Sequence, residues 1–212
     1  DTRNTGIKHS KGKYITFIDS DDAIQNYTLQ ALMDEINKYP ETDVLEYPIM
    51  ERIGHPYKEQ LLAFTPRNYN NCWEYWLNEQ GYLHTYACNK IFRRCLFKNV
   101  YFPKGKTFED VQTIPFLIGL IPTEGTFQQK VKIRVTNKGC YLYYWNNKGI
   151  TASAKYEDLL SLYIGQSMAL IHTFKTIGNR DDIMQKYQLS INIYLTQILN
   201  VLMDLFEVSG KY

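Results

Sequence analysis

KGKYITFIDSDDAI, residues 11–24, combines an apolar alternating run with a dense cluster of acids. The run over residues 14–18 has the pattern of a strand with little solvent exposure, and it ends at Asp19, Asp21 and Asp22. Neighbouring carboxylates repel one another, and an unpaired buried carboxylate is costly. Water, a cation or a set of hydrogen-bond donors must therefore neutralise this cluster.

A helix and a second strand follow the cluster. We expect a strand from Tyr14 to Asp19, a helix from Asn26 to Tyr39 and a strand from Asp43 to Met50. This order is typical of a βαβ unit in a parallel sheet and predicts the α/β fold class. Ligands gather at the carboxyl ends of parallel strands, and the acidic cluster stands at such an end.

The rest of the chain divides into a mixed region and a helical region. Up to about residue 150 we first expect a loop or inserted hairpin over Glu51–Pro66. Helical segments are expected over Asn71–Glu79, Asn89–Arg94 and Glu109–Leu120, and Pro115 should kink or shorten the last of them. Strands are expected over Thr126–Thr136 and Gly139–Trp145. Two long amphipathic helices follow and predict a helical hairpin. We therefore divide the chain into an α/β unit, residues 1–151, and a hairpin, residues 152–212.

The second hairpin helix, Ile183–Glu207, carries apolar residues beyond a single stripe. Burial of more than one face in the protein core is the simpler interpretation. The pattern also fits a contact with a second copy of the chain or with the face of a membrane.

Composition excludes several classes of protein. Apolar residues make up 44% of the 212 residues and charged residues 22%, which is typical of a soluble globular protein. The formal net charge of +2 is too small to indicate a nucleic-acid partner. The four cysteines and four histidines show no zinc-binding spacing, and reduced cysteines favour a cytoplasmic location.

The acidic cluster by itself has two interpretations. Asp-x-Asp on a tight turn suits a hard divalent cation with oxygen ligands. Alternatively, Asp21 or Asp22 caps the helix that begins near Asn26. For an isolated motif the helix cap is the better interpretation.

Four motifs, taken in their order along the chain, favour the cation site over the helix cap. They are TRNTGIKHSKGKYITFIDSDD at residues 2–22, CNKIFRR at 88–94, FPKGKTFEDV at 102–111 and YLYYW at 141–145. Their order and content resemble the family 2 glycosyltransferases, enzymes of GT-A fold, and the resemblance covers about residues 2–151. The chain departs from the family after the last motif, where Trp145 and Asn147 stand in place of arginines that many relatives carry.

The resemblance assigns the acidic residues distinct roles. Asp19 would face the nucleotide or its ribose, and Asp21, supported by Asp22, would bind the Mg²⁺ or Mn²⁺ that bridges the diphosphate of a nucleotide sugar. Asp110 would be the general base for the acceptor hydroxyl, with Glu109 as the rival candidate. Without the family, Glu109 and Asp110 would be explained as acids that favour a helix start.

Three further polar residues take ligand-binding roles in the resemblance. Arg3, Asn4 and Lys90 would lie around the nucleotide and acceptor ends of the cleft. Ordinary surface roles explain these three residues equally well.

The resemblance implies an inverting, metal-dependent glycosyltransferase that acts in surface polysaccharide or lipopolysaccharide synthesis. We expect a UDP-sugar donor, a glycan or lipid-linked acceptor, and a bacterial protein at the cytoplasmic face of the membrane. The family also begins with strands that hold the nucleotide base; about 60–90 such residues would precede this chain, so we expect a partial GT-A fold that is inactive alone.

Two other functions fit parts of the same sequence. One is a glycosyltransferase-like module that binds ligands without catalysis. The other is a haloacid-dehalogenase-type phosphotransferase with Asp19 as nucleophile and Asp21 as acid, but the later acidic motif of that family does not occur.

Overall fold

The α/β part is built on two small mixed sheets. The structure, a computed structural model, describes residues 2–123, 130–147 and 154–210. In the first sheet the strands follow the order β1 (Tyr14–Thr16), β7 (Lys90–Arg93), β3 (Val44–Glu46), β8 (Ile133–Val135) and β6 (Arg67–Tyr69). In the second the order is β2 (Ala23–Ile24), β9 (Tyr141–Tyr144), β4 (Ile49–Ile53) and β5 (Gln60–Leu62).

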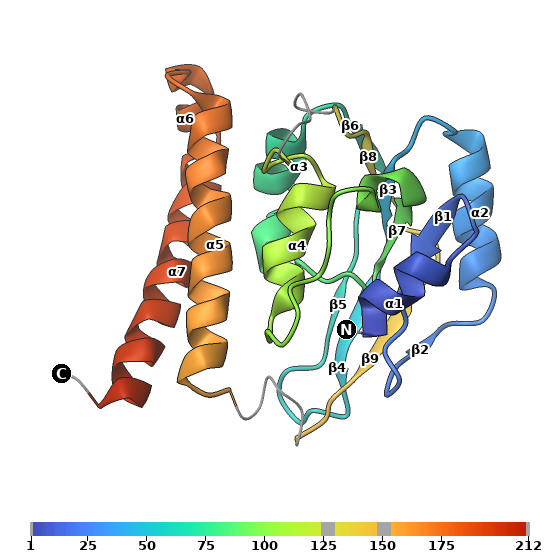
Figure 1. Cartoon of the computed structure of the whole chain (residues 1–212). Helices are drawn as coiled ribbons and strands as arrows, with labels where there is room; N and C mark the ends of the chain where they lie inside the picture. Colours follow the sequence, from blue (N-terminus) through green and yellow to red (C-terminus); the bar gives the residue numbers. More distant parts are fainter. Residues whose placement is uncertain (1, 124–129, 148–153, 211–212) are drawn as a thin grey trace.

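The expected βαβ unit is present, with an antiparallel strand inserted in it. β1 and β3 both pair antiparallel with β7, so they run in the same direction on either side of it. The helix between them in sequence is α2 (Thr28–Lys38), which lies on the outer side of this sheet (Figure 1). The expected helical turn over Asn89–Arg94 is wrong, because Ile91 and Phe92 are buried between two strands and the 3₁₀ turn η2 begins only at Arg94. Among the described strands, β1 pairs only with β7.

The strand expected over Asp43–Met50 is two strands in different sheets. β3 ends at Glu46, and β4 begins at Ile49. Pro48 lies between them, and proline has no amide hydrogen to donate to a strand ladder. The chain therefore changes sheets here. β4 then turns back into β5, which confirms the hairpin alternative for residues 51–66.

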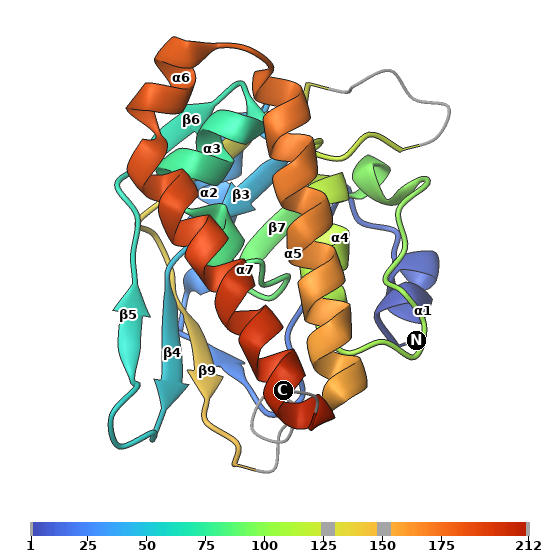
Figure 2. The same cartoon turned by 90° about the vertical axis from the view of Figure 1, so that its left-hand side faces the viewer.

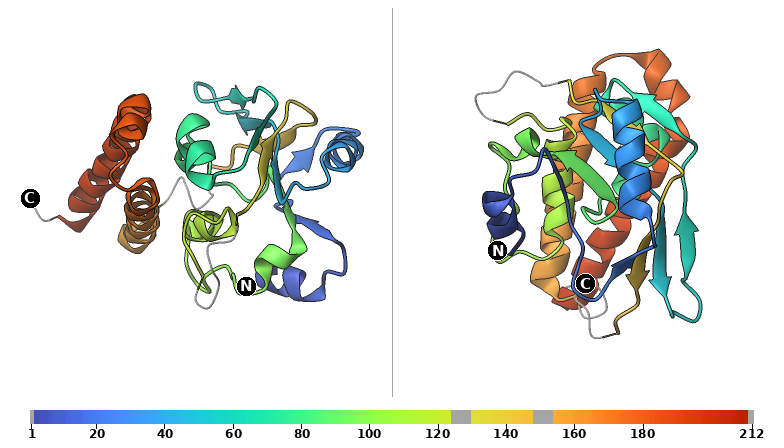
Figure 3. Two further views of the ribbon diagram at one scale, coloured as in Figure 1. Left: turned by 90° about the horizontal axis from the view of Figure 1, so that it is seen from above. Right: turned by 90° about the vertical axis from the view of Figure 1, so that its right-hand side faces the viewer.

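The helices form further layers on the opposite side of the first sheet. α1 (Thr2–His9), a helix that the sequence did not lead us to expect, lies at the β1 edge. α3 (Cys72–Asn78) and α4 (Glu109–Leu117) cover the sheet, and α5 (Tyr156–Ile177) and α7 (Gln188–Ser209) form an outer layer (Figures 1 and 3). α4 contains Pro115 and ends two residues later, shorter than expected. The second hairpin helix is interrupted, because α6 (Asp181–Lys186) precedes α7.

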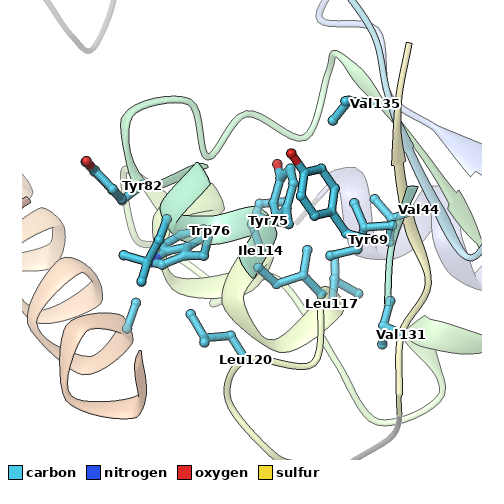
Figure 4. Packing of buried hydrophobic residues seen from close by; sticks show 14 of the residues in the cluster. Val44, Tyr69, Tyr75, Trp76, Tyr82, Ile114, Leu117, Leu120, Val131 and Val135 are labelled. Atoms are coloured by element: carbon cyan, nitrogen blue, oxygen red, sulfur yellow. The ribbon is translucent and has the colours of Figure 1, made fainter. Parts of the chain in front are cut away.

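Aromatic side chains join the hairpin to the α/β part. Trp76 and Tyr82 pack with residues of α4 and of the sheet in one buried cluster (Figure 4). The Tyr82 ring stacks on the Tyr194 ring of α7 with centroids 4.3 Å apart, and Tyr82 donates a 2.7 Å hydrogen bond to the Ser190 carbonyl. Gly165 of α5 lies so close to Val111 of α4 that an added Cβ would be 3.1 Å from its side chain. The hairpin therefore shares its core with α3 and α4.

The fold agrees with the α/β class and the C-terminal helical hairpin expected from the sequence. The division at residues 151 and 152, and the first residues of the expected strand 126–136, lie outside the described residues. α7 is long and apolar enough, by length and composition, to cross a membrane, although 33% of its most apolar window is buried inside the protein.

Candidate active site

A cleft of about 950 Å³ opens beside β1 and α1. Its walls come from α1, from residues 14–22, from the loop at residues 102–106 and from the start of α4. Residues of the β9 region complete the lining. The polar side chains that line it include Arg3, Asp19, Asp21, Asp22, Lys106, Glu109 and Asn146. The acidic turn and the Glu109 region, about 90 residues apart in sequence, thus meet in one cleft.

Arg3 holds the acids of the cleft together. Its Nη2 lies 2.9 Å from Asp19 Oδ1, and its Nη1 lies 2.5 Å from Glu109 Oε1 and 2.6 Å from Asp110 Oδ1. The Arg3 side chain is 20% exposed. Burial by itself would lower the pKa of Arg3, but the three carboxylates raise it above its ordinary value. We call these four residues the Arg3 cluster.

Asp110 is the most enclosed acid of the Arg3 cluster. Arg3 donates to one of its carboxylate oxygens, and the backbone amide of Ala87 donates to the other, Oδ2, at 2.9 Å. Burial raises the pKa of Asp110 to about 6, against the opposing effects of Arg3 and the Ala87 amide; Glu109 and Asp19 raise it further. A carboxylate with a pKa near neutral suits a general base. Glu109 is more exposed, 29% against 19%, and lines the cleft.

The acidic turn is fixed by the tyrosine-rich strand β9. The Tyr141 hydroxyl donates to Asp22 Oδ2 at 2.8 Å and accepts from the Asp19 amide at 3.1 Å, while the Tyr144 amide donates to Asp22 Oδ1 at 3.0 Å. Burial raises the pKa of Asp22, although these two bonds to its carboxylate oppose the shift. Asp22 therefore holds the turn in place.

The helix-cap interpretation of the acidic cluster is wrong. The residue before α2 is Tyr27, and its side chain makes no capping bond. Asp22 reaches β9 instead, and Asp21 remains exposed at the cleft.

The turn offers a divalent cation suitable donors in an incomplete arrangement. Asp19 and Asp21 both line the cleft, and their carboxylate oxygens are the hard ligands that Mg²⁺ and Mn²⁺ prefer. The Asp19 carboxylate, however, is already paired with Arg3 in this structure. Among the described residues, no group of three or more acids, histidines or cysteines is arranged to hold a metal ion. The donor chemistry therefore fits, and Asp21 is the carboxylate left open to a ligand.

Two residues expected at the cleft lie elsewhere. The Asn4 side chain exchanges two hydrogen bonds with the backbone of Phe102, at 2.8 and 2.9 Å, and so anchors the loop that carries a cleft wall. Lys90 has no exposed surface and pairs with buried Glu46 at 2.7 Å. The expectation that Lys90 lies around the nucleotide and acceptor is therefore corrected: β7 is a central strand that points this side chain into the core.

Sequence reasoning missed Tyr141 and Ala87 as parts of this site. Tyr141 stands in the tyrosine-rich motif at residues 141–145, but its hydroxyl is directed at Asp22 only because β9 pairs with β2 beyond the turn. Ala87 contributes its backbone amide, which no side-chain motif can reveal.

A family model, a curated protein and several solved structures are similar to this chain. The family model described as glycosyl transferase family 2 matches residues 1–100. The minor teichoic acid biosynthesis protein GgaB of Bacillus subtilis (strain 168) is 24% identical over 153 residues, which are 71% of this chain and 16% of GgaB. This chain thus spans a small part of the length of that curated relative.

Solved structures of S. aureus TarS share the fold. TarS 1–349 in complex with UDP-GlcNAc superimposes with a TM-score of 0.61 at 22% identity, covering 81% of this chain and 46% of that one. A second structure of TarS 1–349 covers 99% of this chain and 61% of that one, with a TM-score of 0.55 at 18% identity. The fold is therefore of the GT-A type found in these proteins. The first 100 residues, which carry Arg3, the acidic turn and β7, are thus similar to glycosyl transferase family 2.

Proposed function

We propose that the cleft binds a nucleotide sugar and that its residues transfer the sugar, with inversion, to a hydroxyl of an acceptor glycan. The observation that carries this proposal is the Arg3 cluster, in which Arg3 joins Asp19 of the acidic turn to Glu109, which lines the same cleft, and to the neighbouring Asp110. A site of this reaction needs acids at the donor side and a carboxylate base at the acceptor side. The cleft has both.

The chemistry assigns the base step to Asp110. The Asp110 carboxylate takes the proton of the acceptor hydroxyl as its oxygen attacks the anomeric carbon of the donor. The bond from that carbon to the diphosphate oxygen breaks on the opposite face, and the nucleoside diphosphate leaves with the electron pair. A pKa near 6 keeps Asp110 ionised at neutral pH while leaving it basic enough to accept the proton. Glu109, which shares Arg3 Nη1 with Asp110, is the matched alternative.

The donor side of the cleft rests on the acidic turn. Asp21 would bind Mg²⁺ or Mn²⁺, Asp22 would hold the turn through Tyr141, and Asp19 would face the nucleotide. Such a cation offsets the negative charge that develops on the leaving diphosphate. Isothermal titration calorimetry with Mn²⁺ and UDP tests this assignment: Asp21→Asn should lose the Mn²⁺ dependence of UDP binding, and a variant that keeps it would exclude Asp21 as a ligand.

We take the donor to be a UDP-sugar and the acceptor to be a cell-surface polymer of the teichoic acid type or its lipid-linked precursor. The names of the relatives support this choice, since GgaB is a minor teichoic acid biosynthesis protein and TarS was solved with UDP-GlcNAc. A panel of UDP-sugars, incubated with the intact protein and a teichoic acid acceptor, would release UDP only with the true donor. Tight UDP binding without turnover across the panel would favour a binding module instead.

The outer face of the hairpin is a second surface for which we propose a role. Figure 2 shows α5 and α7 side by side and antiparallel, with the end of α7 beside the start of α5. Both expose apolar side chains at alternating spacings of four and three residues, which is the pattern of a helix-packing seam; they are Ile164, Met168 and Ile171 on α5 and Leu199, Met203 and Phe206 on α7.

Charge favours a second copy of the chain as the occupant of this face. Lys175 continues the α5 stripe at one end of the hairpin, while Asp204 and Glu207 lie near the other end on α7. A two-fold antiparallel contact would place the basic end of one hairpin on the acidic end of the next. α7 itself carries no lysine or arginine that would attract an anionic membrane.

Solution mass measurement tests this contact. Light scattering should show a dimer for the intact protein and a monomer for Met203→Glu, with the unfolding temperature little changed. A monomer that binds anionic vesicles would instead assign the face to a membrane, and a monomer that binds neither would remove the proposed role.

A further inference from the structure

A buried ionic network lies next to the candidate base and outside the cleft. Glu46 of β3 is fully buried and accepts from Lys90 at 2.7 Å and from the Tyr75 hydroxyl at 2.5 Å. His84 Nδ1 lies 2.8 Å from the same carboxylate, and its Nε2 lies 2.8 Å from the Glu79 carbonyl. We call Glu46, Lys90, His84, Tyr75 and Asn89 the Glu46 cluster.

The Glu46 cluster fixes a loop rather than a ligand. Lys90 Nζ donates to the carbonyls of His84 and Tyr86 at 2.9 and 2.8 Å. The Tyr47 hydroxyl donates to the Cys88 carbonyl at 2.9 Å. The carbonyls of residues 84, 86 and 88 are thus held by Lys90 of β7 and by Tyr47, which follows β3. An unpaired carbonyl would be costly in this buried position.

The clamped loop presents one amide to the active site. The Ala87 N–H lies between the held carbonyls of Tyr86 and Cys88, and it donates to Asp110 Oδ2 at 2.9 Å. Among the described residues, this is the hydrogen bond that joins the loop to the candidate base. A loop free to rotate at residues 86–88 would lose it, because the direction of an amide follows the orientation of the peptide plane.

We propose that Lys90, with Tyr47, is a positioning residue that holds loop 84–89 so that the Ala87 amide points at the Asp110 carboxylate. Lys90 touches neither the cleft nor a substrate and acts through the loop. The inference rests on the proposed role of Asp110 in catalysis.

Titratable groups face Asp110 from four parts of the chain. Arg3 faces it from α1, Asp19 from the turn after β1, Glu109 from its own helix and the Cys88 thiol from the loop. The Ala87 bond stabilises the ionised form of Asp110. Its loss should therefore raise the pKa of Asp110.

The test compares three variants in the intact protein. Lys90→Met combined with Glu46→Gln removes both buried charges together, so that neither is left unpaired. Tyr47→Phe removes only the hydroxyl that holds Cys88 and keeps the ring in the core. Lys98→Met, at an exposed lysine of the same region, is the matched control.

Two readouts separate positioning from a general loss of structure. Carbon-13 NMR should show the Asp110 carboxyl titrating about one pH unit higher in the double variant and less in Tyr47→Phe, with the Ala87 amide exchanging faster with solvent. The acid limb of kcat/KM should move by the same amount, while UDP affinity stays unchanged. Lys98→Met should match the wild type.

The outcomes can be told apart. If neither the double variant nor Tyr47→Phe shifts the Asp110 titration, the positioning role is wrong, and Tyr47→Phe alone decides this where the double variant does not fold. If the wild type shows no turnover with any donor, the proposed function fails, but the NMR titration and the exchange of the Ala87 amide still test the positioning role.

Discussion

The Arg3 cluster and the Glu46 cluster each pair a buried or half-buried cation with acid from a distant part of the chain, Arg3 with three carboxylates and Lys90 with one, yet they differ in exposure. The side chains of the Arg3 cluster are 19–42% exposed, whereas those of Glu46 and Lys90 have no exposed surface. A half-open cluster can exchange its partners for a ligand, because water compensates each opened contact. A buried cluster cannot, because an unpaired buried charge is costly. The comparison assigns binding and catalysis to Arg3 and its acids, and positioning to Glu46 and Lys90.

The largest expected effect is on kcat, when Asp110, the proposed general base, is replaced. Asp110→Asn should lower kcat by about 10²–10⁴-fold and leave the Kd for UDP unchanged, since it acts on the acceptor. Glu109→Gln is the matched control, because its carboxylate shares Arg3 Nη1 with Asp110. Steady-state kinetics on both variants decide the assignment, and a reversed pattern would move the base by one residue.

The next largest effect is on the free energy of unfolding, when the positively charged side chain of each cluster is replaced. Lys90→Met alone should lower the free energy of unfolding by about 3–5 kcal/mol, because Glu46 is left charged and unpaired in the core. Arg3→Met should cost only about 1 kcal/mol, since its acids regain water. Urea unfolding of the two variants measures both values, and equal losses would remove the distinction between the clusters.

The two clusters should also respond to pH in opposite directions. Burial raises the pKa of Asp110 to about 6, so the folded protein binds this proton more tightly than the unfolded chain does. Its contribution to stability therefore falls as pH rises from about 4 to 6. For Glu46, burial alone would raise the pKa, but Lys90 and His84 lower it. Its contribution is present above about pH 4.5 and is lost as pH falls further.

Unfolding measured between pH 4 and pH 7 checks the sign of the effect at Asp110. The stability of Asp110→Asn relative to the wild type should rise with pH through this interval, because only the wild type has this carboxyl to ionise. A relative stability that falls with pH would show that Arg3 dominates over burial at Asp110.

The smallest expected effect concerns the support of the acidic turn. Tyr141→Phe removes the hydroxyl that joins Asp22 to the Asp19 amide and should cost about 1 kcal/mol of stability. It should also weaken Mn²⁺-dependent UDP binding more than Tyr57→Phe does, since Tyr57 is exposed and does not line the cleft. Thermal unfolding and calorimetry measure the two effects. Identical behaviour of both variants would show that the support of Asp22 by Tyr141 does not contribute to donor binding.

The sequence by itself determined the parts of this protein that depend on local pattern and on ordered motifs. Alternation before Asp19, helical periodicity in α2 and the hairpin, and the four motifs indicated an α/β glycosyltransferase-like chain with a C-terminal helical hairpin. The same motifs brought Arg3, Asp19, Glu109 and Asp110 together as candidates, and the structure places these four in one cluster.

Only the tertiary structure decided where strands change sheets and which polar side chains face the core. The sequence predicted a short helical turn over Asn89–Arg94, where the structure has strand β7. A buried Lys90 is tolerated in this strand only because Glu46, from another strand, neutralises it. Likewise, the link from Ala87 to Asp110 depends on a backbone amide whose direction is set by Lys90 and Tyr47. Charge pairing and amide direction arise from contacts between distant segments, and a pattern of neighbouring residues carries no information about them.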